Sequence, residues 1–365
     1  MATRSNPQRS SQLSPQLSHA LVLHGAKDLR LEVRHTPPPP PGELQIAIRA
    51  TGLCGSDLHY YHHGRNGDFV VRSPLCLGHE SVGMVTATGV GVNNFEAGDR
   101  VALEVGLPCR KCSLCIQGRY NICRTLRFRS SAKTSPHLDG TLMELTSHPA
   151  GMCHMLPARI SDVQGALIEP LAVCLHAIRR SNPPPATEVR GEETSALIFG
   201  AGAIGLLLTA ALAATQRFDT LVPEAETAQL ILSTFSVPDG FSRTYDCTGV
   251  ASCVRTGIYA TGPGGAVVQI GMGGESQPRI PLSAAALREI DLIGVFRYDG
   301  QGYPDAVALM ASGKLDGVAE LVVTHCVQLE DGVRAFELAG KGVDEQGKTV
   351  VKVVVVSGQE EKDIS

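Results

Sequence analysis

The segment SALIFGAGAIGLLLTAALAAT, residues 195–215, carries the strongest structural signal in this 365-residue chain. Five residues typical of a buried β-strand lead into Gly200, Gly202 and Gly205, and an Ala- and Leu-rich stretch typical of a helix follows. A G-x-G-x-x-G motif between a strand and a helix is typical of dinucleotide binding, because its glycines allow a tight turn and a close approach of the pyrophosphate to the helix N-terminus. We predict that these glycines bind a coenzyme; the alternative is a glycine turn without a ligand.

The same region resembles a membrane span at first sight, because residues 194–216 contain no charged side chain. The three glycines interrupt it after a short apolar run, however. A buried strand and a buried helix on either side of a glycine turn explain the pattern better. We therefore expect no membrane-spanning segment.

Apolar runs of β type alternate with helical stretches from residue 171 to residue 298. The helical pattern begins at LAVCLHAIRR (171–180), and the later β runs are RTYDCTG (243–249), GGAVVQIGMG (264–273) and REIDLIGVFRY (288–298). Alternation of this kind is typical of βαβ units and of a parallel sheet.

The N-terminal half has a different pattern, in which short alternating segments are separated by glycine and proline. Residues 19–35 predict a β-hairpin, and PPPPPG at 37–42 predicts a stiff connector. Strands are expected in the runs ELQIAIRATGL (43–53), ESVGMVTATGVGV (80–92) and DRVALEV (99–105), which together predict a small barrel or sandwich. The final runs VVTHCVQLED (322–331) and KTVVKVVVV (348–356) return to β character.

Composition limits the possible functions. Hydrophobic residues make up 43% of the chain and charged residues 19%, which is typical of a globular protein. The net charge of −4 and the lack of a basic cluster argue against nucleic-acid binding. Eleven cysteines without a secretory signal favour metal-binding or buried thiols over disulfides. Residues 1–18 are rich in Ser, Gln and Pro and lack an amphipathic import pattern, so we expect a disordered tail and a cytoplasmic protein.

Four cysteines lie close together in PCRKCSLCIQGRYNIC, with the spacing C-x2-C-x2-C-x7-C: Cys109, Cys112, Cys115 and Cys123. A structural zinc is held by four thiolates that short loops bring into a tetrahedron. An iron–sulfur cluster also uses four thiolates, but no proline follows the last cysteine here. We favour zinc over a cluster and over four free thiols.

A second set combines Cys54, the pair His79–Glu80, and Glu169. A catalytic zinc keeps three protein ligands and one open position, and it acts as a Lewis acid on a bound oxygen. The apolar neighbours of Glu169 indicate a buried carboxylate, which needs a charge partner such as a metal.

Residues 78–92 fit the spacing G-H-E-x2-G-x5-G-x2-V. With the four-cysteine segment, this resembles the zinc-containing medium-chain alcohol dehydrogenases. Within that family the chain is similar to the polyol branch (sorbitol, xylitol and L-arabinitol dehydrogenases), in the motifs CGSDLHYYHHGR, GRYNIC, ALIEPLAV, GIYAT and GVFRY. The resemblance extends from about residue 20 to residue 357.

The resemblance implies that Cys54, His79 and Glu80 bind the catalytic zinc. It places Glu169 beside the metal and the substrate, as a direct ligand or through a water. The four-cysteine segment stands where the family carries its structural zinc.

The resemblance also implies roles for five further residues. Ser56 and His59 would relay the alcohol proton outward, while Tyr60, Arg297 and Tyr298 would hydrogen-bond the polyol hydroxyls. A polar pocket suits a polyol, because an apolar one would leave several hydroxyls unpaired. The alternative for the last two residues is the end of a strand that faces solvent.

We therefore predict an α/β protein in which a GroES-like β-barrel catalytic domain is combined with a Rossmann-type doubly wound coenzyme domain. The implied cofactors are one catalytic zinc, one structural zinc and NAD; the implied assembly is a homo-tetramer. The expected domains are a tail at 1–18, the catalytic domain at 19–171, the coenzyme domain at 172–299, and a segment at 300–365 that returns to the catalytic domain.

The coenzyme domain is shorter than its motif requires. An acidic residue is expected about 20 residues after the glycines, at the end of the second strand, yet only 48 positions separate Gly200 from Thr248. In one placement residues 218–224 form that strand and Glu224 binds the ribose, although Pro223 argues against a central strand. In the other, which we slightly favour, residues 217–223 belong to a helix and loop, and the second strand is missing from the sheet.

The predicted reaction is the zinc-dependent, NAD-linked oxidation of a secondary alcohol of a polyol to a ketose. The main alternative is a zinc-folded family member that has lost coenzyme binding and activity, or a faulty gene model. A branch acting on threonine or simple alcohols is a further alternative, against which Glu80, Arg297 and Tyr298 argue.

Overall fold

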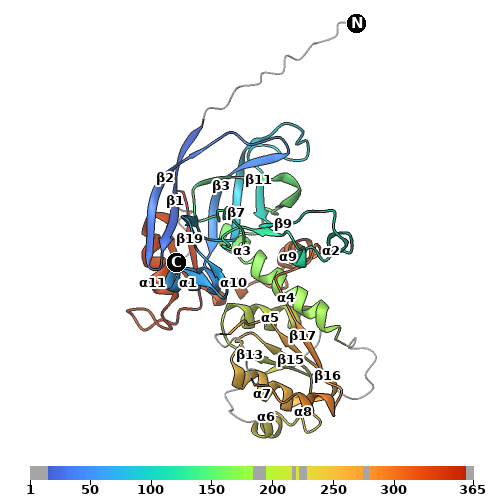
Figure 1. Ribbon diagram of the computed structural model, residues 1–365. Coiled ribbons are helices and arrows are strands. Elements are labelled where there is room, and N and C mark those ends of the chain that lie inside the picture. Colours follow the sequence, from blue (N-terminus) through green and yellow to red (C-terminus); the bar gives the residue numbers. More distant parts are fainter. Residues whose placement is uncertain (1–14, 184–194, 216–218, 222–227, 274–278, 359–365) are drawn as a thin grey trace, which may run out of the picture.

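A computed structural model describes residues 15–183, 195–215, 219–221, 228–273 and 279–358. The chain forms a β-rich part and an α/β part, which the continuous helix α4 (Ile168–Ser181) connects (Figure 1). No helix among the described residues is long and apolar enough to cross a membrane.

The β-rich part is built on a seven-stranded sheet of order β12–β8–β7–β3–β19–β18, with β11 paired to β3 as well. Its central strand β3 is buried at seven of ten positions, so side chains on both faces of this strand are largely covered. The strands are β3 (Glu43–Gly52), β7 (Glu80–Thr88), β8 (Arg100–Leu103), β11 (Leu145–Pro149), β12 (Cys153–Met155), β18 (Val323–Gln328) and β19 (Lys352–Val356).

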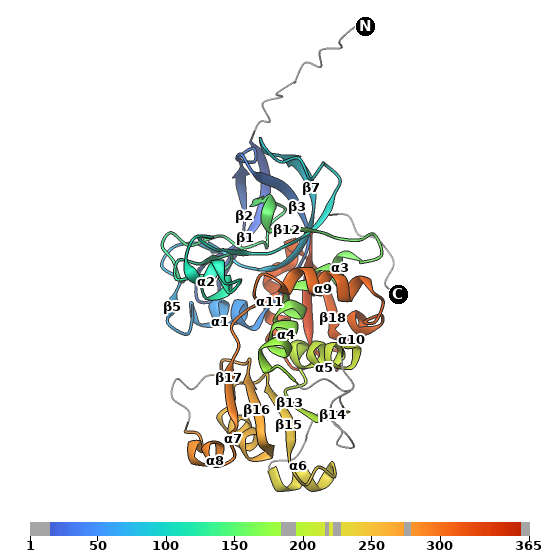
Figure 2. The same ribbon diagram turned by 90° about the vertical axis from the view of Figure 1, so that its right-hand side faces the viewer.

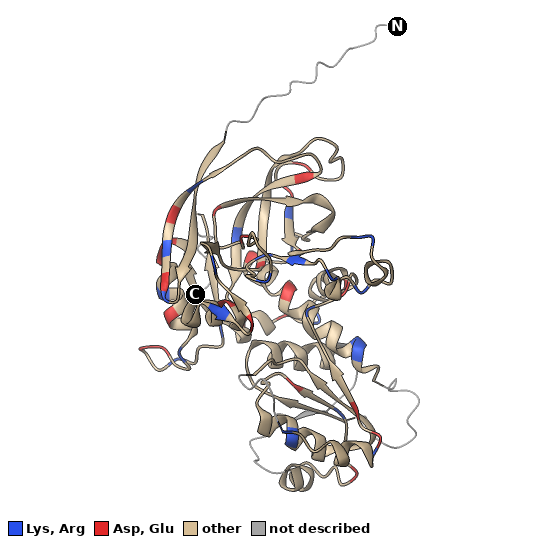
Figure 3. Cartoon of the chain, viewed as in Figure 1, with Lys and Arg blue, Asp and Glu red and all other residues tan. Residues whose placement is uncertain are grey.

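The predicted N-terminal hairpin is confirmed: β1 (Gln16–Gly25) pairs antiparallel with β2 (Asp28–Thr36), and β6 (Leu75–Cys76) adds to β1. Basic and acidic side chains are interspersed along this hairpin (Figure 3). The smaller elements are α1 (Gly55–His63), β4 (Arg65–Asn66), β5 (Phe69–Val70), β9 (Gly106–Leu107), α2 (Ser113–Ile116), β10 (Arg127–Phe128), α3 (Asp162–Ala166), α9 (Gly302–Ala311), α10 (Val318–Val322) and α11 (Gly332–Ala339).

The α/β part contains the predicted parallel sheet, in the order β14–β13–β15–β16–β17. All five residues of β13 are buried, which explains the unbroken apolar run. The sheet lies between α4 with α5 on one side and α6, α7 and α8 on the other (Figures 1 and 2). The elements are β13 (Ser195–Phe199), α5 (Ala203–Thr215), β14 (Asp219–Leu221), α6 (Ala228–Thr234), β15 (Phe241–Asp246), α7 (Ala251–Ala260), β16 (Thr261–Gln269), α8 (Leu282–Ala286) and β17 (Asp291–Gly294).

The placement that we favoured for residues 217–223 is wrong. β14 pairs in parallel with β13, with Ser195 opposite Asp219, so a strand does stand beside the first strand of the sheet. The strand as described covers Asp219–Leu221, and Pro223 lies outside the described residues. Glu224 lies outside the described residues. The usual Rossmann order has one more strand beyond the second, whereas β14 forms the edge of the described sheet.

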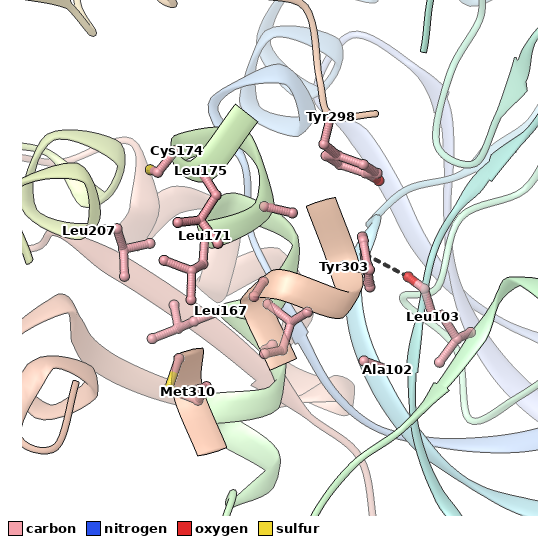
Figure 4. Packing of buried hydrophobic residues seen from close by; sticks show 14 of the residues in the cluster. Ala102, Leu103, Leu167, Leu171, Cys174, Leu175, Leu207, Tyr298, Tyr303 and Met310 are labelled. Atoms are coloured by element: carbon pink, nitrogen blue, oxygen red, sulfur yellow. Dashed lines mark hydrogen bonds between the residues drawn. The ribbon is translucent and has the colours of Figure 1, made fainter. Parts of the chain in front are cut away.

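One hydrophobic core spans both parts of the molecule. Leu167 and Leu171 of the α4 region pack with Leu207 of α5 and Met310 of α9 (Figure 4). On the side of the β-sheet, the hydroxyl of Tyr303 donates a hydrogen bond of 2.7 Å to the carbonyl oxygen of Leu103. The residues that α4 and α9 carry are therefore held against the barrel.

Candidate active site and zinc centres

Cys54, His79 and Glu80 come together where three elements meet. Cys54 stands immediately before α1, and His79–Glu80 lie at the start of β7. β7 pairs antiparallel with β3 so that Glu80 is opposite Gly52, two residues before Cys54. One possible ligand atom from each of the three residues lies within 4.8 Å of the others.

Asp57, which the sequence did not single out, lies next to the histidine. Its carboxylate is fully buried, and Oδ1 lies 3.4 Å from Nδ1 of His79. Ser130 Oγ donates to this carboxylate at 2.6 Å, and the backbone N–H of Cys54 donates at 3.1 Å. Burial works against ionisation, but His79 and these donors keep the pKa of Asp57 below its ordinary value. Because Asp57 faces Nδ1, Nε2 of His79 is left for a metal.

Lys352 of β19 is a second residue that the sequence did not single out. Its side chain is buried, and its Nζ forms an ion pair with Oε2 of Glu80. Gly52 makes room for this pair: a Cβ at that position would collide with the Glu80 carboxylate and lie 3.1 Å from Cε of Lys352. Glu80 thus lies next to Cys54 and His79 and also forms an ion pair with a cationic side chain.

This donor set fits a catalytic zinc. A thiolate, an imidazole and a carboxylate are ligands that zinc accepts, and three protein ligands leave a fourth position open. A carboxylate 3.4 Å from the imidazole resembles the carboxylate–histidine pairs that surround zinc in proteins.

The four cysteines of the predicted structural centre also lie together, with their sulfur atoms within 4.8 Å of one another. Sγ of Cys115 is 3.5 Å from that of Cys112 and 3.9 Å from that of Cys109. A tetrahedral ion with Zn–S bonds of about 2.3 Å needs sulfur separations of roughly 3.8 Å. Backbone N–H groups of Lys111 and Cys112 lower the pKa of Cys109 to about 6. Burial and the neighbouring thiols, in contrast, raise the pKa of Cys115 to about 12, so the assignment of a metal rests on the sulfur distances. This set fits a structural zinc.

Glu169 lies in the first turn of α4 and is 5% exposed. Burial raises the pKa of this carboxyl to about 7, and the like charge of Glu80 acts in the same direction. His79, Lys352 and Arg297 oppose this rise. Glu169 therefore holds a proton more readily than an exposed carboxyl would.

One aromatic ring, that of Phe128, separates Arg297 from His79. The guanidinium Cζ of Arg297 lies 3.5 Å from the ring centroid of Phe128, and the ring of His79 packs against Phe128 with centroids 5.5 Å apart. Nη1 of Arg297 is buried and has no hydrogen-bond partner among the described residues. The backbone of Arg297 is left-handed, with φ of 57°, which is unusual for a bulky residue.

Tyr298 and Tyr60 are both buried. The hydroxyl of Tyr298 has no hydrogen-bond partner within the described part of the chain, and its ring packs edge-on against Tyr303 at 5.1 Å (Figure 4). The hydroxyl of Tyr60 accepts a 3.1 Å hydrogen bond from the backbone N–H of Ala132, so its own proton is available to another acceptor. The alternative of a solvent-facing strand end is wrong, because β17 ends at Gly294 and Tyr298 is 1% exposed.

Ser56 and His59 lie on α1, the helix that begins after Cys54. Ser56 is half-buried and His59 is exposed. The ring of His59 is 6.1 Å from that of His63, and no hydrogen bond between Ser56 and His59 is present in the described structure.

The glycine motif has the geometry of a close-packed turn between β13 and α5. Gly200 has φ of +103°, and a Cβ there would lie 3.0 Å from Cγ2 of Thr248. A Cβ on Gly205 would collide with the carbonyl oxygen of Gly200, whereas Gly202 has open space beside it. Open space at the middle glycine is what an approaching pyrophosphate needs.

A third residue that sequence reasoning missed is Asp246, which organises the neighbouring loop. Its buried carboxylate accepts hydrogen bonds from the backbone N–H groups of Thr248 (2.9 Å) and Gly249 (3.0 Å) and from Nε2 of Gln269 (2.7 Å). Asp57, Lys352 and Asp246 share one sequence signal. Each is a single charged residue within or beside a run that is otherwise apolar or uncharged.

Comparisons with known proteins agree with this geometry. Residues 40–158 match the family described as Alcohol dehydrogenase GroES-like domain, and residues 209–312 match the family described as Zinc-binding dehydrogenase. The chain is 37% identical to the Probable D-xylulose reductase A of Emericella nidulans, over 92% of this chain and 97% of the relative. It is 39% identical to the sorbitol dehydrogenase of Mus musculus, over 89% of this chain and 93% of the relative.

Solved structures show the same architecture. The crystal structure of L-idonate 5-dehydrogenase from Escherichia coli superposes with a TM-score of 0.79 at 26% identity, covering 94% of this chain and 99% of that one. The alignment with the Emericella relative extends over 362 positions but includes only 92% of this chain, so the relative has residues where this chain has none. The expected resemblance to the polyol branch and the combination of GroES-like and Rossmann-type domains are confirmed: this chain belongs to the family of zinc-binding dehydrogenases.

Proposed function

We propose that this chain is a zinc- and NAD-dependent dehydrogenase that oxidises a secondary hydroxyl of a polyol to a ketone. The proposal rests on one observation. Buried polar groups of Arg297 and Tyr298 have no hydrogen-bond partner within the part of the chain that the structure describes, and they lie beside Glu169 and the set of Cys54 and His79. Such groups are costly unless a ligand completes their hydrogen bonds. Relatives named D-xylulose reductase and sorbitol dehydrogenase support a polyhydroxylated ligand.

Cys54, His79 and Glu80 would hold the catalytic zinc, and the four cysteines from Cys109 to Cys123 would hold a structural zinc. When bound, the catalytic ion supplies Lewis acidity, which lowers the pKa of the substrate hydroxyl. Asp57 keeps the imidazole of His79 in its orientation, while Lys352 compensates the charge of Glu80.

Glu169 would hold or accept a proton next to the reacting hydroxyl, since burial raises its pKa to about 7. Ser56 and His59 would carry the proton from there toward solvent, because α1 extends from the metal set to the exposed ring of His59.

Tyr60, Arg297 and Tyr298 would bind the remaining hydroxyls of the polyol. Arginine can donate to several hydroxyl oxygens, while each tyrosine can both donate and accept. A site of this kind discriminates strongly against an alcohol that lacks these hydroxyls, because its own polar groups are then left unpaired.

The coenzyme would bind at the C-terminal edge of the parallel sheet, with its pyrophosphate at Gly200, Gly202 and Gly205. Hydride would pass from the substrate carbon to the nicotinamide. We infer NAD as the coenzyme; Glu224, if it faces the ribose, would also repel the 2′-phosphate of NADP.

Two measurements on the zinc-loaded protein test the proposal. Titration with NADH, followed by nicotinamide fluorescence, is expected to give saturable binding, and a panel of xylitol, sorbitol and L-arabinitol with NAD is expected to show turnover. Two zinc ions per chain without NADH binding would instead support the second candidate, a family member that has lost its coenzyme. The shortened segment between α5 and β15 is the observation that favours this second candidate.

We also infer a homo-tetramer in the cytoplasm, as the resemblance to the polyol branch implies. Light scattering coupled to gel filtration tests the assembly, and a mass other than four chains would contradict it. Fractionation of the source cells tests the location.

A further inference from the structure

The four-cysteine segment reaches beyond its own metal set and contacts the segment that carries Arg297. Asn121 lies in the single turn of helix at Tyr120–Ile122, two residues before the last cysteine of the set, and it is 4% exposed. Its Nδ2 donates a 2.8 Å hydrogen bond to the carbonyl oxygen of Phe296. Only the N–H face of the amide can make this bond, because a carbonyl oxygen is an acceptor.

A second bond joins the same two segments. The backbone N–H of Gly300 donates to the carbonyl oxygen of Gly118 at 3.3 Å. The chain from Phe296 to Gly300 is therefore tied at both ends to the end of the four-cysteine segment.

The segment is tied to α4 from the other side. Asp299 accepts a 2.5 Å hydrogen bond from Arg179 of α4, and its carboxylate lies 3.2 Å from Nδ1 of His176 on the same helix. α4 is also the helix that carries Glu169 in its first turn. Residues 296–300 are therefore held against the four-cysteine segment on one side and against α4 on the other.

Arg297 needs such support. A bulky residue in the left-handed region persists only where the surrounding structure holds it there, and the residue directly before it is the one whose carbonyl Asn121 binds. The guanidinium stacks on Phe128 at 3.5 Å and on Phe296 at 4.6 Å, so a shift of the Phe296 peptide would move Arg297 away from the ring that contacts His79.

We propose that Asn121 is a positioning residue for substrate: from the four-cysteine segment it fixes the Phe296 peptide and thereby places Arg297 for the polyol hydroxyls. The inference rests on the proposed function, since it assigns Arg297 to the substrate. According to this proposal, the four-cysteine segment contributes to the selection of polyol substrates as well as to folding.

The test compares Asn121→Ala with Arg119→Ala, which removes an exposed side chain two residues earlier in the same segment. Asn121→Ala is expected to raise KM for xylitol or sorbitol about tenfold, with kcat, NADH affinity and two zinc ions per chain unchanged. Arg119→Ala is expected to change none of these. If the alanine variant folds poorly, Asn121→Leu fills similar space without the donor and is expected to behave in the same way.

A double-mutant cycle identifies the residue through which Asn121 acts. In an Arg297→Ala background, Asn121→Ala is expected to change KM less than twofold, because the positioned group is already gone. The proposal would be overturned if Asn121→Ala raised KM tenfold in the Arg297→Ala background as well. It would also be overturned if Asn121→Ala alone left KM unchanged.

Amide hydrogen exchange tests the positioning role of Asn121 without relying on catalytic activity, so it distinguishes a failure of this inference from a failure of the proposed function. Asn121→Ala is expected to speed exchange of the amides at 296–300 at least tenfold, and Arg119→Ala is expected to leave it unchanged. Unchanged exchange would overturn the inference even in an active enzyme. A wild-type chain that oxidises no polyol would instead overturn the proposed function, and with it the substrate role given to Asn121.

Discussion

The proposed metal centre and the coenzyme edge of the parallel sheet differ in the contacts that hold them in place. Around His79 and Glu80, three buried side chains from separate regions of the chain lie close together: Asp57 is next to His79, Ser130 donates to Asp57, and Lys352 pairs with Glu80. At the coenzyme edge, the described part of the sheet ends in β14 (Asp219–Leu221), whose one partner among the described strands is β13. We therefore expect metal binding to depend on the β-rich part of the chain and not on the length of the coenzyme domain.

The largest effect is expected when a proposed ligand of the catalytic zinc is removed. This substitution tests whether metal binding and coenzyme binding are independent. Cys54→Ser is expected to lower kcat for polyol oxidation by at least a thousandfold and to reduce the zinc content from two ions per chain to one. NADH affinity is expected to stay within a factor of two, because the glycine motif is built on β13 and α5. Metal analysis and fluorescence titration measure both, with Cys326→Ser, at an exposed thiol, as the control. Retained turnover in Cys54→Ser would contradict the metal assignment.

A smaller effect is expected when the charge partner of Glu80 is removed. Lys352→Met leaves a buried carboxylate without its ammonium, which costs about 3 kcal/mol of unfolding free energy in the metal-free protein. The loss is expected to be smaller with zinc bound, because the ion then compensates the same charge. Urea unfolding with and without a chelator measures the two values.

Lys352→Arg retains a positive charge and serves as the control for this comparison. An equal loss of stability in the metal-free and zinc-loaded Lys352→Met proteins would show that Glu80 does not face the metal.

The contact between α4 and the Arg297 segment gives a pH-dependent prediction. Burial opposes ionisation of Asp299, but hydrogen bonds and charges from His176 and Arg179 lower its pKa to about 2. A carboxyl with a lowered folded-state pKa stabilises the fold above its unfolded value near 3.8, and this contribution disappears as the pH falls toward 2. Asp299→Asn is therefore expected to cost about 2 kcal/mol at pH 6.

Unfolding curves of wild type and Asp299→Asn at several pH values measure this cost, and the difference between them is expected to shrink between pH 4 and pH 2. The matched control is Asp316→Asn, which breaks an exposed pair with Arg159 and is expected to change stability by less than about 0.5 kcal/mol. A gap for Asp299→Asn that stays constant down to pH 2 would contradict the role of the carboxylate.

The sequence predicts well what local spacing determines. The glycine motif needs only a strand before it and a helix after it, and the four cysteines lie within one short segment, so both could be recognised without the fold. His79 and Glu80 are adjacent, and their distance from Cys54 is bridged by one antiparallel pairing, that of β3 with β7.

The residues that were missed depend on contacts between distant segments. Lys352 reaches Glu80 only because β19 pairs with β3 with Val354 opposite Gly52, and nothing in the run VVKVVVV specifies that register. The error at residues 217–223 has a different cause. Pro223 argues against a central strand over all of residues 218–224, but it has no bearing on residues 219–221, which pair with β13.

The smallest predicted effect concerns the coenzyme edge itself. Thr248 Oγ1 donates to Asp246 at 2.6 Å and accepts from the backbone N–H of Val250 at 3.0 Å, so it holds the loop that contacts Gly200. Thr248→Ala is expected to weaken NADH binding about fivefold, which corresponds to the roughly 1 kcal/mol of one hydrogen bond. Thr248→Ser keeps the hydroxyl and is expected to restore most of the affinity. Since the metal centre is fixed by the barrel, both variants should retain two zinc ions per chain; a loss of zinc in either would show that the two regions are coupled after all.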